Sequence, residues 1–137
     1  MKEQSIENIE QDYWQAPAPD ASGLIRQLYS VRKKSITDLS VEDLRLLIGQ
    51  NVCLSNTVPT AINILKDDLF AEGDYYPGDL LVNLLTSDKQ FWAQNPILKQ
   101  QVESLCADLD VIIAQNCDLS ETTEREILKA FAGFLNQ

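Results

Sequence analysis

The chain has no histidine, and its 137 residues include three cysteines, five glycines and one methionine. Without histidine it lacks the commonest general base of hydrolases and the commonest nitrogen ligand of zinc. Cys53, Cys106 and Cys117 are odd in number and match no zinc-binding spacing, so we expect small buried hydrophobic side chains in a reducing cytoplasm. The sequence therefore predicts no metal site and no cofactor.

Basic residues are also scarce, because 11 lysines and arginines stand against 21 aspartates and glutamates, a net charge of −10. This charge repels nucleic acid and anionic lipid, and it favours a cationic protein as partner. No apolar run resembles a signal peptide or has the length of a membrane span. We expect a cytoplasmic protein with no membrane contact and no direct contact with nucleic acid.

The densest basic segment is Arg32-Lys33-Lys34, with Arg26 nearby. It has two interpretations: a nucleic-acid patch, or solvated charges that complement the C-terminus of a helix. We favour the second, because three or four bases in so acidic a chain make a poor nucleic-acid patch.

Catalytic motifs are missing as well. The sequence contains no G-x-S-x-G elbow and no glycine-rich phosphate loop. Glu72, Asp74 and Asp79 do not have the spacing of a calcium-binding EF-hand loop. We expect no enzyme and no small-molecule substrate, and a carboxylate-based enzyme stays a distant third hypothesis.

What the sequence does contain is helical periodicity, without the period-two alternation of strands. It predicts an all-α fold, in which residues 1–137 form a single-domain irregular bundle of about six to eight helices. Residues 1–20 are expected to form an N-terminal helix, from Ser5 to Trp14, followed by a proline-rich strap. One further helix is predicted over about residues 24–34, a second starts at Ser40 with a capping box, and a third runs from Ser55 or Thr57 to Lys66 with Pro59 in its first turn. A fourth starts near Asp79, a fifth follows a cap at Ser87, and a sixth follows a cap at Ser120.

One long helix is predicted to start at Asn95-Pro96, which has the form of an N-cap followed by proline at the first helical position. Its outer face would hold three acids, Glu103, Asp108 and Asp110. Its inner stripe would be Leu98, Val102, Leu105, Leu109 and Ile112.

The stretch from Leu69 to Leu81 gathers breakers, acids and aromatic residues between two helical patterns. Gly73, Pro77 and Gly78 restrict its backbone, while Asp74 and Asp79 are suited to accept backbone N–H bonds or to cap the next helix. It can be interpreted as a structural joint or as a recognition surface for a basic partner. The recognition residues would be Glu72, Asp74, Tyr75, Tyr76 and Asp79.

Asp67 and Asp68 lie just before this stretch, at the end of a predicted helix where the helix dipole disfavours acids. Either the positive charge of a partner or chance explains them. From Asp67 to Asp88 the chain has acids and no base, which makes this segment strongly one-sided in charge.

Three segments, at residues 32–34, 41–50 and 71–81, resemble in order and spacing the helical immunity proteins of bacterial contact-dependent growth inhibition (CDI) systems. The most specific part is Gly73-Asp74-Tyr75-Tyr76-Pro77-Gly78-Asp79-Leu80-Leu81. Departures from the family occur at Leu69-Phe70 and at Ser35, where prolines are expected.

The resemblance implies a cytosolic protein that binds the C-terminal toxin domain of a delivered effector and blocks it stoichiometrically, often by covering a nuclease active site. Many such toxins are basic and cleave tRNA or DNA, which agrees with the charge of −10. If relatives share the motif, it sets their common fold, and toxin specificity lies with Glu103, Asp108, Asp110 and the pair Asp67-Asp68. Both sets stay candidates for toxin binding, and the alternative function is an acidic helical adaptor or regulatory subunit that binds a basic protein.

Overall fold

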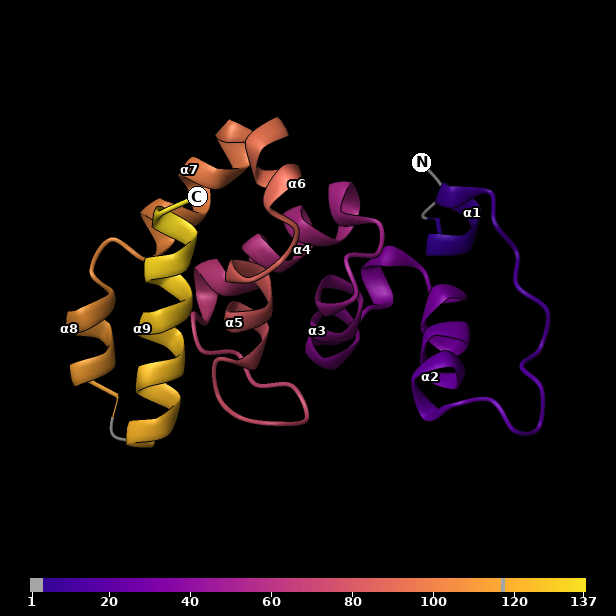
Figure 1. Cartoon of the computed structure of the whole chain (residues 1–137), viewed down its shortest axis with the longest axis horizontal. Coiled ribbons are helices and arrows are strands. Elements are labelled where there is room, and N and C mark those ends of the chain that lie inside the picture. Colours follow the sequence, from indigo (N-terminus) through magenta and orange to yellow (C-terminus); the bar gives the residue numbers. More distant parts are fainter. Residues whose placement is uncertain (1–3, 117) are drawn as a thin grey trace.

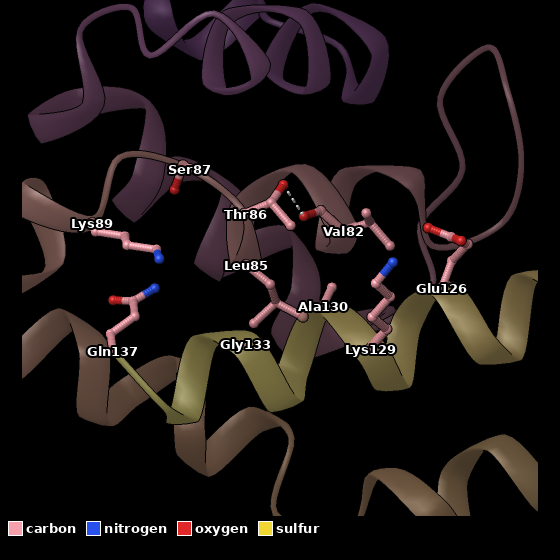
Figure 2. A pocket seen from close by; sticks show the side chains of 10 residues that line it. All are labelled: Val82, Leu85, Thr86, Ser87, Lys89, Glu126, Lys129, Ala130, Gly133 and Gln137. Carbon is pink, nitrogen blue, oxygen red and sulfur yellow. Dashed lines mark hydrogen bonds between the residues drawn. The ribbon is translucent and has the colours of Figure 1, made fainter.

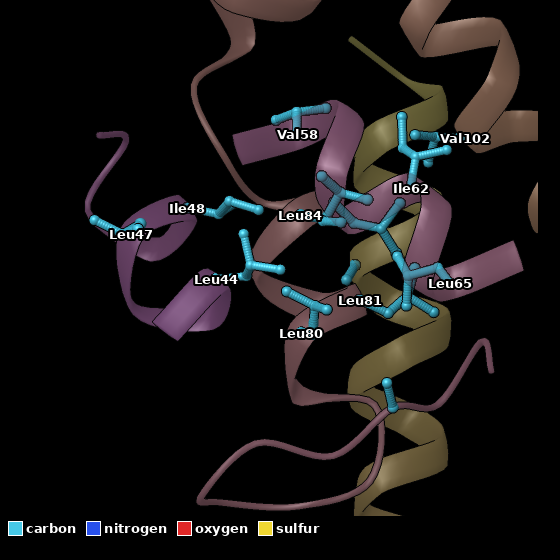
Figure 3. Packing of buried hydrophobic residues seen from close by; sticks show 14 of the residues in the cluster. Leu44, Leu47, Ile48, Val58, Ile62, Leu65, Leu80, Leu81, Leu84 and Val102 are labelled. Atoms are coloured by element: carbon cyan, nitrogen blue, oxygen red, sulfur yellow. The ribbon is translucent and has the colours of Figure 1, made fainter. Parts of the chain in front are cut away.

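The core of the computed structural model, which describes residues 4–116 and 118–137, surrounds helix α5 (Asp79–Leu85). Helices α3 (Val41–Gly49), α4 (Leu54–Asp67) and α9 (Glu121–Leu135) pack against it (Figure 1). Helix α5 is only seven residues long, so tertiary packing must supply most of its stability. Figure 3 shows the side chains that enclose it, which include Leu44, Leu47 and Ile48 of α3, Val58, Ile62 and Leu65 of α4, and Leu80, Leu81 and Leu84 of α5 itself.

In the view of Figure 1, α6 and α7 lie along the upper edge, α1 and α2 form one end of the long axis, and α8 and α9 form the other end. Trp92 joins the helices near this second end, because its ring meets Phe134 of α9 edge-on with centroids 5.0 Å apart. The remaining elements are α1 (Ile6–Glu10), α2 (Gly23–Arg32), the 3-10 helix η1 (Ile36–Asp38), α6 (Lys89–Gln94), α7 (Pro96–Leu105) and α8 (Leu109–Ala114).

The prediction of an all-α fold is confirmed, and the described residues contain two isolated β-bridges but no named strand. Several predicted caps are present, since Ser5 and Ser120 accept hydrogen bonds from backbone N–H groups in their helices. The capping box at Ser40 is also confirmed, because Ser40 and Asp43 each accept from the other's backbone N–H. Within the part of the chain that the structure describes, no helix has the length and apolar character needed to cross a membrane.

The predicted long helix after Asn95-Pro96 is wrong, because α7 ends at Leu105 and α8 begins only at Leu109. Between them Leu109 donates its N–H to the Cys106 carbonyl at 3.1 Å, a turn that redirects the chain. Leu109 is nevertheless buried, so the chain after the turn still packs apolar side chains into the core, but from a new direction. With this split, the described residues hold nine α-helices.

Three smaller boundaries also differ from the prediction. Helix α1 ends at Glu10, where Gln11 adopts a left-handed conformation with φ 54°, so Trp14 lies outside the helix. Helix α4 begins at Leu54, which places Pro59 in its interior. Asp88 caps α6, whereas Ser87 is buried and accepts a hydrogen bond from the Trp92 indole N–H at 2.9 Å.

The cysteines follow the prediction in part. Cys106 is a buried free thiol, and Cys53 is a half-buried free thiol at the start of α4. Cys117 lies outside the described residues.

Candidate functional site

The loop between Ala71 and Gly78 is shaped by the buried carboxylate of Asp79, which is only 2% exposed. Asp79 accepts hydrogen bonds from the backbone N–H groups of Gly73 at 2.7 Å, Tyr75 at 3.1 Å and Tyr76 at 3.4 Å. The carboxylate also lies in the first turn of α5, where the helix dipole favours negative charge. Asp79 therefore serves the interior of the loop, as the structural interpretation predicts.

A second carboxylate, Glu42 of α3, holds the loop from the other side. Glu42 accepts two hydrogen bonds of 2.7 Å from Arg45 and one of 2.9 Å from the backbone N–H of Asp74. These bonds, those from Arg45 above all, keep the pKa of the Glu42 carboxyl below its ordinary value although burial opposes this. A Cβ at Gly73 would lie 2.6 Å from Glu42 Oε1, so a larger residue here would displace the Glu42 carboxylate from its hydrogen bonds.

The aromatic part of the loop is tied down by the same arginine. The Arg45 guanidinium lies over the Tyr75 ring, 4.3 Å from its centroid. The other face of Tyr75 meets solvent, and the residue is 69% exposed. Tyr76 is half-buried, and burial is the main cause that raises the pKa of its hydroxyl. Glu42 and Arg45 lie within the motif segment 41–50, and their i, i+3 spacing is the only sequence signal for this ion pair.

The other predicted site residues fall into separate groups. Asp67 and Asp68 are exposed where α4 ends and the chain leads into the loop, next to exposed Glu72 and Asp74. The buried residues Phe70 and Ala71 separate the Asp67-Asp68 pair along the chain from the exposed Glu72, Asp74 and Tyr75.

The predicted acidic face of Glu103, Asp108 and Asp110 is divided between two helices. Glu103 is half-buried on α7, whereas Asp108 and Asp110 are exposed around the first turn of α8. The expectation of one shared helix face is therefore wrong. Beside the two exposed aspartates lies Val111, an apolar side chain that is 56% exposed, so this end of α8 combines unpaired charge with apolar surface.

The basic segment after α2 is largely occupied by internal partners. Arg32 is buried, pairs with Glu10 and donates to the Asp12 carbonyl at 2.6 Å, and its guanidinium lies 4.7 Å from the Trp14 ring centroid. Lys34 pairs with Asp43 at 2.8 Å. The expectation that these charges are solvated is wrong for Arg32, which fastens the segment after α1 to α2.

Charge is unevenly divided along the chain. Residues 103–137 contain seven acids and two bases, a net charge of −5, which is half of the −10 of the whole chain. Arg125 forms an ion pair with Glu121 at 3.5 Å there, and both side chains are exposed. In the described part of the chain, no cluster of three His, Cys, Asp or Glu residues is arranged to hold a metal ion.

Comparison with known proteins gives one family. The model of the CDI immunity proteins matches residues 8–102, which is more than half of the chain and includes all three motif segments. No curated protein matches the chain. The whole of the strongly acidic segment 103–137 lies beyond the matched residues, whereas helices α3, α4 and α5 and the loop that Asp79 and Glu42 organise lie within them.

Proposed function

Because the chain belongs to the family of CDI immunity proteins, whose members neutralise CDI toxins, we propose that it binds the C-terminal toxin domain of its cognate effector directly. The toxin in this proposal is a basic ribonuclease, and binding covers its active site at a stoichiometry of 1:1. The chain acts in the cytoplasm and does no chemistry of its own.

The observation that carries the proposal is the location of the free acids. Three acids of the shared motif, Glu42, Asp43 and Asp79, are used internally, by Arg45, by Lys34 and by loop N–H groups, whereas Glu72 and Asp74 are exposed. The exposed acids at the start of α8 have no ion-pair partner among the described residues. A nuclease that binds polyanionic RNA needs a positive active-site cleft, and a surface with unpaired acids complements such a cleft.

Within this proposal, the start of α8 is the first contact surface, made of Asp108, Asp110 and Val111. An exposed apolar side chain next to two carboxylates can be buried and desolvated in the interface while the carboxylates pair with lysines and arginines of the toxin. The second candidate surface consists of Asp67, Asp68, Glu72, Asp74 and Tyr75, which are all exposed. Glu103 and Tyr76 stay candidates as half-buried residues. We leave Asp79 out, because its carboxylate is buried.

The experiment compares the two surfaces in association kinetics with the toxin domain encoded next to this chain's gene. The double variant Asp108→Lys/Asp110→Lys should slow association at least tenfold at low salt and flatten its salt dependence, because steering depends on charge. The same reversal at Asp67 and Asp68 serves as the matched variant. If both double variants associate like the wild type, electrostatic contact through either surface is refuted.

The family match favours this function over an acidic adaptor or regulatory subunit. The two differ in a simple observable, because an adaptor would leave the activity of the neighbouring toxin domain unchanged. An enzyme working through carboxylates gains no support from the loop acids, since Asp79 and Glu42 are occupied by structural hydrogen bonds.

A further inference from the structure

A groove of about 370 Å³ runs between the C-terminal end of α5 and helix α9 (Figure 2). We call it the α5–α9 groove. Its apolar floor is formed by Val82, Leu85 and Ala130, and Gly133 of α9 lies beside Ala130. Lys89 lies toward one end and Lys129 toward the other, as Figure 2 shows, with Glu126 beyond Lys129. The sequence does not predict the groove, because its two sides are about 45 residues apart in the chain.

Nothing in the surroundings of Gly133 requires glycine at this position. A Cβ added there meets nothing within 4 Å, and the residue has no positive φ. Glycine inside a helix costs about 0.5 to 1 kcal/mol relative to alanine. The fold would therefore be more stable with alanine at this position, and a glycine is useful where the backbone of another molecule approaches the helix closely.

The two lysines give the groove a charge opposite to that of the chain. Neither Lys89 nor Lys129 has an ion-pair partner among residues 4–116 and 118–137, although the chain has nearly twice as many acids as bases. Arg32, Lys34 and Arg45, in contrast, are all paired with acids of the chain. Two unpaired ammonium groups around an apolar floor suit a carboxylate that is carried next to apolar groups.

We propose that the α5–α9 groove receives a segment of the toxin domain that presents an aspartate or glutamate side chain beside apolar residues. This inference rests on the proposed function. It adds a second contact, in which lysines of this chain bind an acid of the toxin, to the contact that the aspartates of α8 make. A second copy of this chain is a poor occupant, because two molecules of charge −10 repel each other. Helix α9 lies outside the residues matched by the family, so the groove is suited to distinguish the cognate toxin from the toxins of relatives.

The test measures the dissociation constant for the neighbouring toxin domain. Gly133→Leu places a side chain into the groove, and Lys89→Glu/Lys129→Glu reverses its charge; each should weaken binding at least tenfold. Lys66→Glu, a charge reversal at an exposed lysine on α4, is the control and should stay within about twofold. Thermal unfolding verifies that each variant is folded, which we expect for Gly133→Leu because leucine favours helix over glycine. An acid-to-lysine change on the toxin that restores affinity to the Lys→Glu double variant would identify the inserted carboxylate.

Unchanged affinity of both groove variants overturns the inference and leaves the proposed function standing, because the wild type would still bind. A wild type that fails to bind the toxin domain overturns both. A wild-type dimer that Gly133→Leu converts to a monomer without loss of toxin binding assigns the groove to self-association and overturns the inference alone.

Discussion

The Asp79 carboxylate accepts a hydrogen bond from the backbone N–H of Gly73 at 2.7 Å, so the last acid of the family motif holds the first residues of the same motif in place. Two more loop N–H groups bind the same carboxylate, and Glu42 binds the N–H of Asp74. Glu42 and Asp79 of the motif are therefore directed inward and shape the loop, whereas Glu72 and Asp74 stay exposed. Under the proposed function, toxin specificity is carried by exposed acids that make no such internal bonds.

Replacing Asp79 by asparagine should lower the free energy of unfolding by about 2 to 3 kcal/mol, because the buried site loses an ionised acceptor of three hydrogen bonds. Asp74→Asn is the matched control in the same loop, and it should change stability by no more than about 0.5 kcal/mol because its side chain is exposed. Urea unfolding followed by circular dichroism measures both. Equal effects of the two variants would contradict the structural role of Asp79.

Stability should fall in acid because of Glu42 and Asp43. The hydrogen bonds from Arg45 hold the pKa of Glu42 below its ordinary value of 4.5, against the effect of burial. Burial raises the pKa of Asp43, but the bonds from Lys34 and Ser40 outweigh it and hold the pKa below 3.8. Near these pKa values the unfolded chain therefore binds more protons than the folded chain. The stabilisation from these two carboxylates is fully present above about pH 5 and is lost as the pH falls through their folded-state pKa values.

Unfolding in urea between pH 3 and 7 tests this dependence. Glu42→Gln should be less stable than the wild type at pH 7 and should lose less stability on acidification, because the variant lacks one of the titrating carboxyls. If the free energy of unfolding of Glu42→Gln falls with decreasing pH as steeply as that of the wild type, other groups dominate the pH dependence.

Arg32→Met should destabilise the fold by roughly 2 kcal/mol, less than the ~3 to 5 kcal/mol expected for a fully buried pair, since the Glu10 side chain keeps 33% of its surface in solvent. The loss should appear locally, because Arg32 also binds the Asp12 carbonyl and the Trp14 ring. Hydrogen exchange should therefore accelerate in residues 11–22. The exposed pair of Arg125 and Glu121 supplies the control variant Arg125→Met, which should have almost no effect.

The thiol of Cys106 should react only when the protein opens. It is buried, and burial raises its pKa to about 11, so very little thiolate is present at pH 8. In a Cys117→Ser background, a thiol reagent should label the half-buried Cys53 first and Cys106 at a rate that follows global unfolding. Rapid labelling of Cys106 without denaturant would contradict the packing of α7 against the core.

Local chemistry explains which parts of this structure can be predicted from the sequence. A serine followed three residues later by an acid forms its cap within one turn, so Ser40 and Asp43 are predictable from spacing alone. The start of α5 at Asp79 is predictable for the same reason, since Gly78 supplies the positive φ of 91° that precedes it.

The predictions from the sequence fail where contacts between residues far apart in the chain determine the structure. The helix after Pro96 breaks at Cys106 although its apolar spacing continues, because Leu109 and Ile113 reach the core only after the chain turns. The solvated interpretation of Arg32 fails because its partners Glu10 and Asp12 lie about 20 residues away. The α5–α9 groove is invisible in the sequence for the same reason. Which acids are used internally and which are free likewise depends on contacts across the fold.

The most direct test of the central claim is a titration of the neighbouring toxin domain, in a ribonuclease assay, with the purified chain. Direct occlusion predicts that activity falls linearly and ends at one equivalent of the chain, and that Asp108→Lys/Asp110→Lys replaces the linear fall by a curve that reaches full inhibition only with excess chain. Full toxin activity in the presence of excess folded chain would contradict the account.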